Sequence, residues 1–308
     1  MKNVWVIKPG ENSNRGIGIM VETKFANIAN EVQNGCQNGR TIILQKYISN
    51  PLLYKNRKFD VRCFSLVTSI NGHIKAYFYK NGYIRTASKE YTLNQNQLHN
   101  KFIHLVNDAV QKHSEDYGKH ETANKVSYAD FQKFLSSQYP HLHINFERDI
   151  ISQVQKIVTD TIRATFHLLD SRKRINSYEL FGYDFMFDRE FRPYLIEVNS
   201  NPSLECSSSL LSKLFRDMLE NTFSIVIDPL FPGPPGFTGR KAVTGYDVCP
   251  LNQFELIFDE RIDGPDLLEK LKKIDPEELL EIETSILNEP DDVEEQEELI
   301  NSSTIGSF

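Results

Sequence analysis

Two Asn-Gly pairs divide the middle of this sequence into three runs of strand-forming residues. The runs cover residues 58–70, 73–79 and 83–88, and they are separated by Asn71-Gly72 and Asn81-Gly82. Asn-Gly is a strong short-range signal for a two-residue hairpin turn, because both residues accept a positive φ. Such turns join neighbouring antiparallel strands. The pattern therefore favours an antiparallel meander at the centre of the fold.

Further strands and helices are expected on both sides of this region. Short apolar, β-branched runs predict strands at residues 4–7, 18–21, 41–48, 181–187 and 193–198. Apolar residues at three- and four-residue spacing predict helices at 101–138 and 147–170, and helices are also expected at 23–35 and 207–226. The chain is thus predicted to mix strands and helices up to about residue 230.

The character of the sequence changes after this point. Pro and Gly recur in residues 231–253, which we interpret as a linker. Residues 254–308 hold 18 Asp and Glu against 4 Lys and Arg, a net charge of −14, and we expect an acidic, largely disordered tail. The preceding residues hold 31 basic against 24 acidic side chains, a net charge of +7. A basic body favours an anionic ligand or partner, although the tail could also serve only solubility.

Several classes of protein are disfavoured by the sequence. No stretch approaches the roughly 20 consecutive apolar residues of a membrane-spanning helix, and no secretory leader is recognised at the start. The four cysteines form no C-x-x-C pair, so we expect a reduced, cytosolic chain without structural zinc. We expect neither a membrane nor a nucleic acid as partner.

The first candidate binding segment runs from Lys8 to Gly18. A predicted strand ends at Lys8, and the following loop has glycines at positions 10, 16 and 18. Glycines let backbone N–H groups approach phosphate oxygens, and lysine adds a mobile positive charge. The segment lacks the Walker pattern. An ordinary surface hairpin is the alternative interpretation.

Three other segments carry polar groups on predicted strands. The end of the strand at Gln45-Lys46-Tyr47-Ile48 could hydrogen-bond an adenine through its main chain. Strict alternation places Lys58, Asp60 and Arg62 on one strand face, which indicates either a charged ligand or a ladder of ion pairs. Arg85 should lie close to them in the sheet, although alone it is more typical of a surface salt bridge.

The sharpest chemical signal lies on the two strands at 181–187 and 193–198. If they form a hairpin pair, Asp184, Glu197 and Asn199 converge, because the last two share a face. Two carboxylates and an amide oxygen suit a hard divalent cation that keeps open positions for phosphate oxygens, as Mg²⁺ does. Without a cation or a basic partner, these buried carboxylates would be costly. We therefore predict a magnesium site.

The order of these segments closely resembles the tubulin tyrosine ligase-like family. The resemblance covers residues 4–230 and is carried by Trp5-Val-Ile-Lys-Pro, Arg15-Gly-Ile-Gly, Lys58-Phe-Asp-Val-Arg, Arg85-Thr-Ala-Ser, His104-Leu-Val-Asn107, Gln111-Lys112, Gly182-Tyr-Asp-Phe and Ile196-Glu-Val-Asn-Ser-Asn-Pro. It implies an α+β ATP-grasp fold, with antiparallel sheets and helices enclosing ATP. Residues 1–230 would form the central and C-terminal catalytic region, and the family's N-terminal domain is expected to be absent.

The resemblance also assigns roles to individual residues. Binding of the ATP phosphates falls to the loop residues Lys8, Ser13, Arg15, Gly16 and Gly18. Binding of adenine falls to the strand end Gln45, Lys46, Tyr47 and Ile48, and binding of the nucleoside to Lys58 and Asp60. The γ-phosphate and the activated carboxyl group would contact Arg62 and Arg85, and Mg²⁺ would be bound by Asp184, Glu197 and Asn199.

The implied activity is an ATP- and Mg²⁺-dependent ligase that joins an amino acid to tubulin through an acyl phosphate. No covalent protein nucleophile is needed, which fits the lack of a Ser-His or Cys-His signature. The partners would be the acidic tails of tubulin and free tyrosine, glutamate or glycine, and the expected location is the cytoplasm, on microtubules and in the cilium. Arg85-Thr-Ala-Ser-Lys-Glu-Tyr91 resembles tyrosine-adding members, whereas Asn199-Ser-Asn-Pro-Ser-Leu-Glu205 resembles glutamate- or glycine-adding ones.

Two alternatives to this activity stay open at the level of sequence. One is a catalytically incomplete, microtubule-binding pseudoenzyme. The other is a ligase of the same fold that acts on an acceptor other than tubulin.

Overall fold

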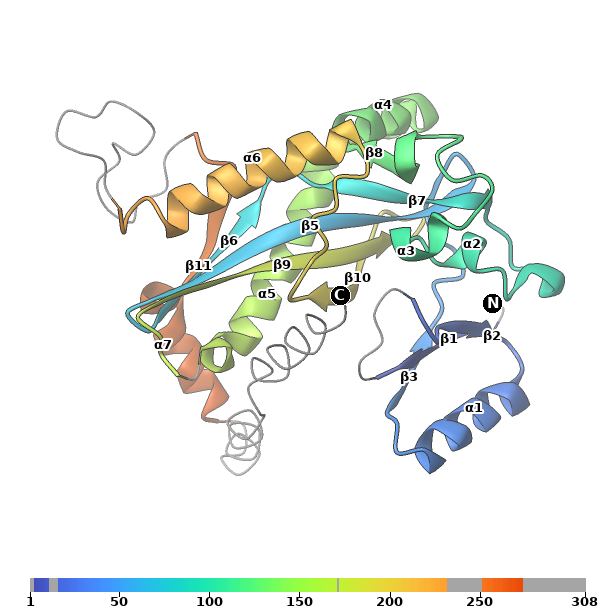
Figure 1. The fold of residues 1–308 in the computed structure, drawn as a ribbon, viewed down its shortest axis with the longest axis horizontal. Coiled ribbons are helices and arrows are strands. Elements are labelled where there is room, and N and C mark those ends of the chain that lie inside the picture. The colour runs from blue at the N-terminus through green and yellow to red at the C-terminus, as the bar shows by residue number, and fades with distance from the viewer. Residues whose placement is uncertain (1–2, 11–15, 171, 232–250, 274–308) are drawn as a thin grey trace, which may run out of the picture.

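The computed structural model of the chain describes residues 3–10, 16–170, 172–231 and 251–273. They form two sheets of unequal size (Figure 1). The smaller, which we call the small lobe, has the strand order β2-β1-β3. It consists of β1 (Trp5–Pro9), β2 (Met20–Glu22), α1 (Phe25–Gln37) and β3 (Ile42–Lys46). All its strand pairs are antiparallel.

The larger sheet is built around one long strand, β5 (Arg57–Ile70). The main path of this sheet is β10-β9-β5-β6-β11, and all its pairs are antiparallel. The neighbours of β5 are β4 (Leu53–Tyr54), β6 (His73–Tyr79), β7 (Tyr83–Glu90) and β9 (Asn176–Phe187), and the outer strands are β8 (Lys125–Ser127), β10 (Pro193–Asn199) and β11 (Phe254–Asp259). Mixed helices and antiparallel sheets confirm the predicted α+β class.

The predicted meander is only half correct. Asn71 and Gly72 both have positive φ values, 52° and 74°, and they join β5 to β6 as a tight hairpin. Beyond Gly82, however, β7 does not pair with β6. It returns to the same edge of β5, where it pairs with residues 57–62, whereas β6 pairs with residues 65–70. The second predicted hairpin is therefore wrong.

Gly82 has a different role from the one its sequence pattern indicates. A Cβ atom at this position would lie 2.4 Å from the carbonyl oxygen of Arg62 and 2.3 Å from the hydroxyl of Tyr128. Such contacts are far too short for any side chain. Gly82 is required because the chain passes close to β5 here, and β5 is long enough to accept two partners along one edge.

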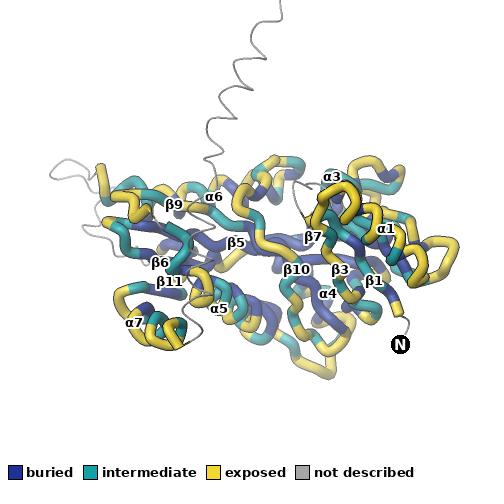
Figure 2. The backbone as a smooth tube through the Cα atoms, turned by 90° about the horizontal axis from the view of Figure 1, so that it is seen from below, coloured by how far each residue is buried: buried dark blue, intermediate teal, exposed yellow. Residues whose placement is uncertain are grey.

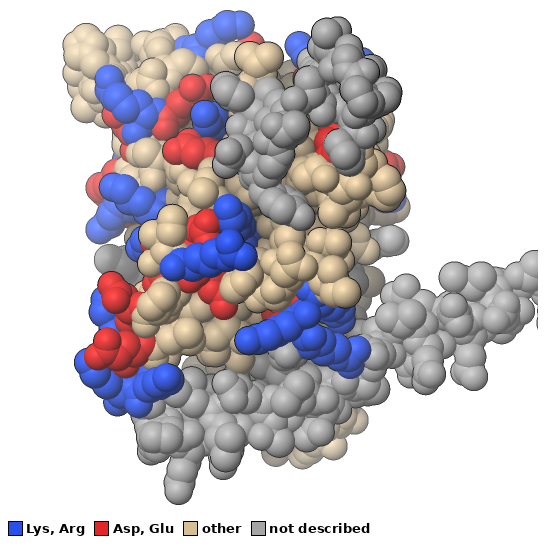
Figure 3. All heavy atoms as spheres, turned by 90° about the vertical axis from the view of Figure 1, so that its left-hand side faces the viewer, with Lys and Arg blue, Asp and Glu red and all other residues tan. Residues whose placement is uncertain are grey.

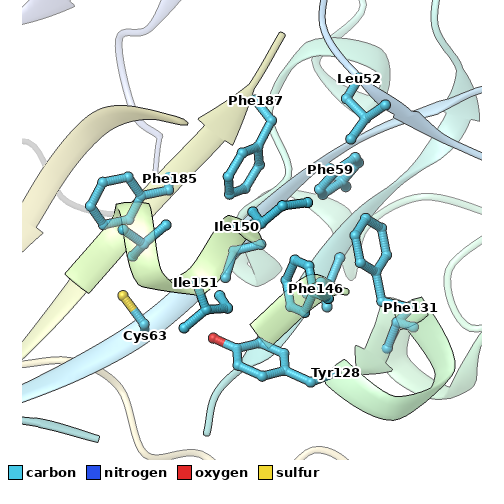
Figure 4. Close-up of a cluster of buried hydrophobic side chains, with 14 of the residues drawn as sticks. Leu52, Phe59, Cys63, Tyr128, Phe131, Phe146, Ile150, Ile151, Phe185 and Phe187 are labelled. Atoms are coloured by element: carbon cyan, nitrogen blue, oxygen red, sulfur yellow. The ribbon is translucent and has the colours of Figure 1, made fainter. Parts of the chain in front are cut away.

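Helices cover both faces of the large sheet (Figure 1). On one face lies α6 (Ser209–Val226), which packs on Phe64 and Leu66 of β5. On the other lie α4 (Tyr128–Gln138), a π-helical turn (Phe146–Ile151), α5 (Ser152–Leu169) and α7 (Glu260–Leu271). The largest core cluster forms between this second group and the sheet, and Phe59, Phe131 and Phe146 contribute to it (Figure 4). Buried positions follow β5 through the middle of the molecule (Figure 2).

The helix predicted at 101–138 is broken into pieces. The segment forms α2 (Lys101–His104), α3 (Asp108–Gln111), strand β8 and then α4. Asn100 and Ser127 cap α2 and α4 through their side chains, and Ala123 and Asn124 adopt left-handed φ values that no helix continues through. By contrast, α1, α5 and α6 confirm the helices predicted at 23–35, 147–170 and 207–226.

Part of the predicted acidic tail belongs to the fold. Strand β11 pairs with β6, and α7 packs against the sheet, so residues 254–271 are ordered and the predicted start of the tail at residue 254 is wrong. The reason is that Phe254 and Phe258 are both buried, at 3% and 1% exposure. The predicted linker at 231–253 and the remainder of the tail lie largely outside the described residues. In the part of the chain that the structure describes, no helix is long and apolar enough to cross a membrane.

Replacing Phe258 with alanine is expected to lower the free energy of unfolding by about 3 kcal/mol. The ring of Phe258 packs on that of Phe166, with 5.0 Å between centroids, so truncation leaves a cavity between β11 and α5. Leu256→Ala on the same strand is the matched control, because Leu256 is 45% exposed. Denaturant unfolding that gives equal losses for both variants would contradict a structural role for β11.

Candidate active site

A pocket opens between the small lobe and the large sheet. Its empty volume is about 1010 Å³ when the space open to solvent is included. The small lobe contributes apolar side chains, Val6, Ile19 and Val21, together with Lys8 and Gly16. The large sheet contributes the charged side chains Lys58, Asp60, Arg85, Asp184 and Glu197. The pocket thus combines an apolar wall with a charged floor.

Strand alternation explains how the charged floor forms. On β5, Phe59 and Val61 point into the main core cluster, so Lys58 and Asp60 point the other way, toward the pocket. The same alternation on β9 buries Tyr183 and Phe185 in that cluster and leaves Asp184 facing the pocket. This outcome confirms the predicted face of β5.

The floor of the pocket is held together by a chain of buried ion pairs. The guanidinium of Arg85 donates from Nε and Nη2 to the two carboxylate oxygens of Asp60 at 2.7 and 2.6 Å, and its Nη2 lies 2.7 Å from Asp184 Oδ2. Arg62 binds both oxygens of Asp184, donating from Nε to Oδ1 and from Nη2 to Oδ2. All four side chains are less than one-tenth exposed.

The carboxyl groups in this chain have shifted pKa values. Burial alone would raise the pKa of Asp184, but Arg85 and Arg62 outweigh it and hold this pKa well below its usual range. The pKa of Asp60 is instead raised, chiefly because this carboxyl group is buried, although Arg85 lowers it. Asp184 is therefore a stable carboxylate at neutral pH.

Arg62 does not contact the pocket, although the resemblance assigns it to the γ-phosphate and the activated carboxyl group. It shares a strand face with Lys58 and Asp60, yet it does not line the pocket. Its guanidinium is directed to Asp184 and lies next to Gly182, where a Cβ would meet Arg62 Nη1 at 3.3 Å. In this arrangement Arg62 supports Asp184, and among the described arginines Arg85 is the one that lines the pocket.

A β-bulge brings the predicted metal ligands together. Between Leu195 and Glu197 the pairing of β10 with β9 shifts by one residue, so Glu197 lies opposite Asp184 and Asn199 opposite Gly182. Without this shift, Glu197 would lie opposite Tyr183, whose side chain enters the core. Asp184, Glu197 and Asn199 all line the pocket.

These three residues fit a divalent cation. The pKa of Glu197 is raised, chiefly because the carboxyl group is partly removed from solvent and secondly because Asp184 lies beside it. No described residue forms a salt bridge with Glu197. An accessible pocket carboxylate without a basic partner is a favourable cation ligand. The described residues contain no group of three His, Cys, Asp or Glu side chains placed to hold a metal ion, so a cation here would also need Asn199 and oxygens from a ligand.

The small-lobe residues predicted to bind ATP lie around the same pocket. Its lining includes Lys8, Gly16, Gln45, Lys46, Tyr47 and Ile48. Burial lowers the pKa of Lys8, and the charge of Glu197 partly offsets this effect. Gly18 has a φ of 76° but does not line this pocket, and Ser13 and Arg15 lie outside the described residues.

Sequence reasoning assigned no contact role to residues 104–107, which form one wall of the pocket. The carbonyl oxygen of His104 accepts a hydrogen bond from Lys58 Nζ at 2.6 Å, and the imidazole Nδ1 lies 2.8 Å from the hydroxyl of Tyr47. These contacts join the wall to β5 and to the segment that follows β3. The only sequence signal was the family motif His104-Leu-Val-Asn107, because no spacing of residues indicates that a loop will return to a distant strand.

Comparison with known proteins agrees with this geometry. The sequence model of the tubulin-tyrosine ligase family matches residues 1–234. Tubulin glycylase 3D of Tetrahymena thermophila is 35% identical over 229 residues, which are 73% of this chain and 21% of that protein. Tubulin glycylase 3A of Drosophila melanogaster is 32% identical over 231 residues, which are 74% of this chain and 22% of that protein.

A shorter relative is covered more fully. The probable alpha-tubulin polyglutamylase Ttll1 of Tetrahymena thermophila is 28% identical over 264 residues, 83% of this chain and 61% of that protein. The chain therefore spans about a fifth of the glycylases and about three-fifths of this relative. The residues matched by the family model include the small lobe, the large sheet up to β10 and every described residue that lines the pocket. On this evidence the chain belongs to the tubulin-tyrosine ligase family.

Proposed function

We propose that this chain is an ATP- and Mg²⁺-dependent ligase that joins an amino acid to tubulin through an acyl-phosphate intermediate. The observation that carries the proposal is the convergence of two kinds of group on one pocket. Lys8, Lys58 and Arg85 supply positive charge, and Asp184, Glu197 and Asn199 supply oxygen ligands. A nucleoside triphosphate complexed with a divalent cation needs both kinds at once.

The two sides of the pocket suit different parts of the nucleotide. Apolar Val6, Ile19 and Val21 suit the flat nucleobase, and the main chain at the end of β3 offers hydrogen-bonding groups to its edge. Lys8 and Gly16 also line the pocket and would contact the phosphates. A Mg²⁺ ion bound by Asp184, Glu197 and Asn199 would neutralise charge on the phosphate oxygens.

The chemistry follows from the thermodynamics of amide formation. A free carboxylate does not condense with an amine, so its oxygen first attacks the γ-phosphorus of ATP and releases ADP. The amine nitrogen then attacks the acyl carbon, phosphate leaves, and the amine loses a proton. Both steps develop negative charge on phosphoryl oxygens, and fixed cations such as Arg85 and Lys58 stabilise it. Hydrogen bonds from Arg85 to Asp60 and from Lys58 to the carbonyl oxygen of His104 hold these cations in position.

The acceptor and the location are inferred from the relatives. Their names specify tubulin glycylation and alpha-tubulin polyglutamylation, so we propose tubulin as acceptor and glycine or glutamate as the added amino acid, with tyrosine as the third candidate. We propose on the same basis that the enzyme acts on microtubules, in the cytoplasm and in the cilium. At the end of the molecule opposite the small lobe, acidic and basic side chains are interspersed (Figure 3), so the described surface there favours no anionic partner over a cationic one.

Glu197→Gln is expected to abolish ATP-dependent incorporation of amino acid while leaving the protein folded. The substitution keeps the size of the side chain and removes one carboxylate from the proposed magnesium site, and loss of such an electrostatic contact lowers turnover by about 10²- to 10³-fold. The measurement uses purified tubulin, ATP and labelled glycine, glutamate or tyrosine in separate reactions. The wild-type protein and the variant are assayed side by side.

The two proteins give distinct outcomes. Label from one amino acid with wild type, lost in the variant, supports both the reaction and the metal site. Undiminished incorporation by Glu197→Gln would overturn the metal assignment. No incorporation of any of the three by the wild-type protein would count against the proposed reaction on tubulin.

Nucleotide binding is also expected to weaken as the pH rises above about 8. Burial lowers the pKa of Lys58 to about 8, although Asp60 opposes this shift. Below that pH the ammonium attracts the nucleotide, and above it the amine is neutral, so the Kd should rise by up to about tenfold per pH unit. Titration of a fluorescent ATP analogue between pH 6.5 and 9.5 measures this dependence. A Lys58→Met variant should bind weakly with a flat profile over the same range, and an equally steep profile would rule out Lys58 as its origin.

A further inference from the structure

Residues 104–107 form a pocket wall, and all four line the pocket. His104 is the last residue of α2, and residues 105–107, which connect α2 to α3, have no regular secondary structure. Backbone carbonyl groups in such a segment have no helix or sheet ladder to satisfy them, so other groups must fix the position of the wall. His104 O is satisfied by Lys58 Nζ, as described above.

Gln111, at the end of α3, makes the other contacts that hold this wall. Its side chain is fully buried, with no exposed surface. Its amide Nε2 donates to the carbonyl oxygens of Leu105 at 2.5 Å and Phe102 at 3.3 Å, and its Oε1 accepts from the backbone N–H of Ser88 at 2.8 Å. One side chain thus uses both donors and its acceptor.

These contacts connect two parts of the pocket. Ser88 lies on β7, the strand that carries Arg85, and Leu105 belongs to the wall whose neighbour His104 binds Lys58. The Gln111 amide therefore sets the spacing between β7, which carries Arg85, and the backbone of His104, which binds Lys58. Arg85 and Lys58 are both proposed to contact the phosphates. A buried carbonyl left without its donor would favour a displaced wall.

A second contact reinforces the start of α3. Lys125 Nζ on β8 lies 2.5 Å from Asp108 Oδ1, and its side chain is 3% exposed. Tyr117 donates from its hydroxyl to the same carboxylate oxygen at 2.8 Å. Helix α3 is consequently anchored to the sheet at both ends, which allows Gln111 to act as a rigid support.

We propose that Gln111 is a positioning residue for nucleotide binding, acting through the wall at residues 104–107. It touches no substrate itself, because it does not line the pocket. The proposal rests on the proposed function only in taking a nucleotide as the ligand. The held position of the wall is a property of the chain alone and can be measured separately.

The test compares Gln111→Glu with Asn124→Asp in the full chain. The first variant retains an acceptor for Ser88 N–H but loses both donors to the wall. Asn124 is a matched control, because its amide is 1% exposed and donates to Thr86 O and Ser88 Oγ, while its oxygen accepts from Gly118 N–H. None of these partners lines the pocket. Gln111→Met, which removes all three hydrogen bonds without adding charge, replaces the first variant if that one does not fold.

Two readouts are made at a temperature where all variants are folded. Amide hydrogen exchange of residues 103–107 reports local opening of the wall, and titration of a fluorescent ATP analogue reports nucleotide affinity. We expect faster exchange in Gln111→Glu and a Kd raised about tenfold, with neither change in Asn124→Asp. Gln111→Glu and Asn124→Asp should both lose thermal stability. Because a merely structural role of either residue would produce this loss, the stability measurement does not distinguish the two variants.

Different results separate the two proposals. Unchanged exchange at residues 103–107 in the Gln111 variants overturns the positioning role, as does an unchanged Kd with an opened wall. Equal effects in Asn124→Asp also overturn it. If the wild-type protein binds no nucleotide, the proposed function fails, and the exchange comparison then decides by itself whether Gln111 holds the wall.

Discussion

Replacing Asp184 with asparagine is expected to have the largest effect of any single substitution in the pocket. The variant should lose about 3–5 kcal/mol of unfolding free energy and all measurable ligase activity. Asp184 is 2% exposed, and two guanidinium groups, those of Arg62 and Arg85, are directed at its carboxylate. The amide would leave both positive charges buried without this anion, and the proposed cation would lose a ligand.

Glu197→Gln separates the two contributions. Glu197 forms no ion pair with either arginine, so its substitution should remove activity at little cost in stability, whereas Asp184→Asn should reduce both. Denaturant unfolding and the incorporation assay, applied to both variants, make the comparison. Equal stability of wild type and Asp184→Asn would show that the ion pairs contribute nothing net.

The acid dependence of stability gives an independent check on Asp184. Its pKa in the folded protein lies below the unfolded value, so its contribution is complete above the unfolded pKa and is lost as the pH falls toward the folded one. Wild type should therefore lose stability on acidification below about pH 4. The asparagine variant should lose less over the same interval, because it has no carboxyl group to protonate.

The second large effect is expected at Arg57, which does not line the pocket. Arg57→Met should lower the unfolding free energy by about 4 kcal/mol. The guanidinium is 2% exposed, binds both carboxylate oxygens of Glu121 at 2.6 and 2.8 Å, and donates to Ala87 O at 3.0 Å. Removing it leaves the Glu121 carboxylate poorly compensated and an acceptor on β7 unpaired.

Lys55 supplies the control for this prediction. Its Nζ lies 3.6 Å from the same Glu121 carboxylate, but the side chain is 57% exposed. Solvent screens such a pair, so Lys55→Met should cost less than about 1 kcal/mol. Urea unfolding of the two variants tests whether burial, rather than the mere presence of a salt bridge, determines the stabilisation. Similar losses in both would contradict this account.

Local sequence patterns were sufficient for most individual elements. Alternation on β5 placed Lys58 and Asp60 on the face opposite Phe59 and Val61, because successive side chains of a strand point in opposite directions. The Asn71-Gly72 turn was predictable because both residues tolerate positive φ. Apolar spacing located α5, since this helix buries one continuous face.

Contacts between distant segments were not predictable in the same way. Gly82 looks like a hairpin residue, yet it permits close approach to β5 and Tyr128. Residues 254–271 look like part of an acidic tail, yet Phe254 and Phe258 of β11 are buried in core clusters on opposite faces of the sheet. In both cases the deciding interaction is made with a strand far away in the sequence, and composition averaged over a segment does not reveal it.

The sequence by itself determined which chemical groups are present, on which strands they lie, and the family to which the chain belongs. Only the tertiary structure decided that Glu197 faces Asp184, because a one-residue bulge in β10 moves its side chain from the core face to the pocket face. The tertiary structure also directed Arg62 to Asp184 and brought residues 104–107 against Lys58. Register and long-range packing depend on the summed energies of many distant contacts, so they are settled only when the whole sheet forms.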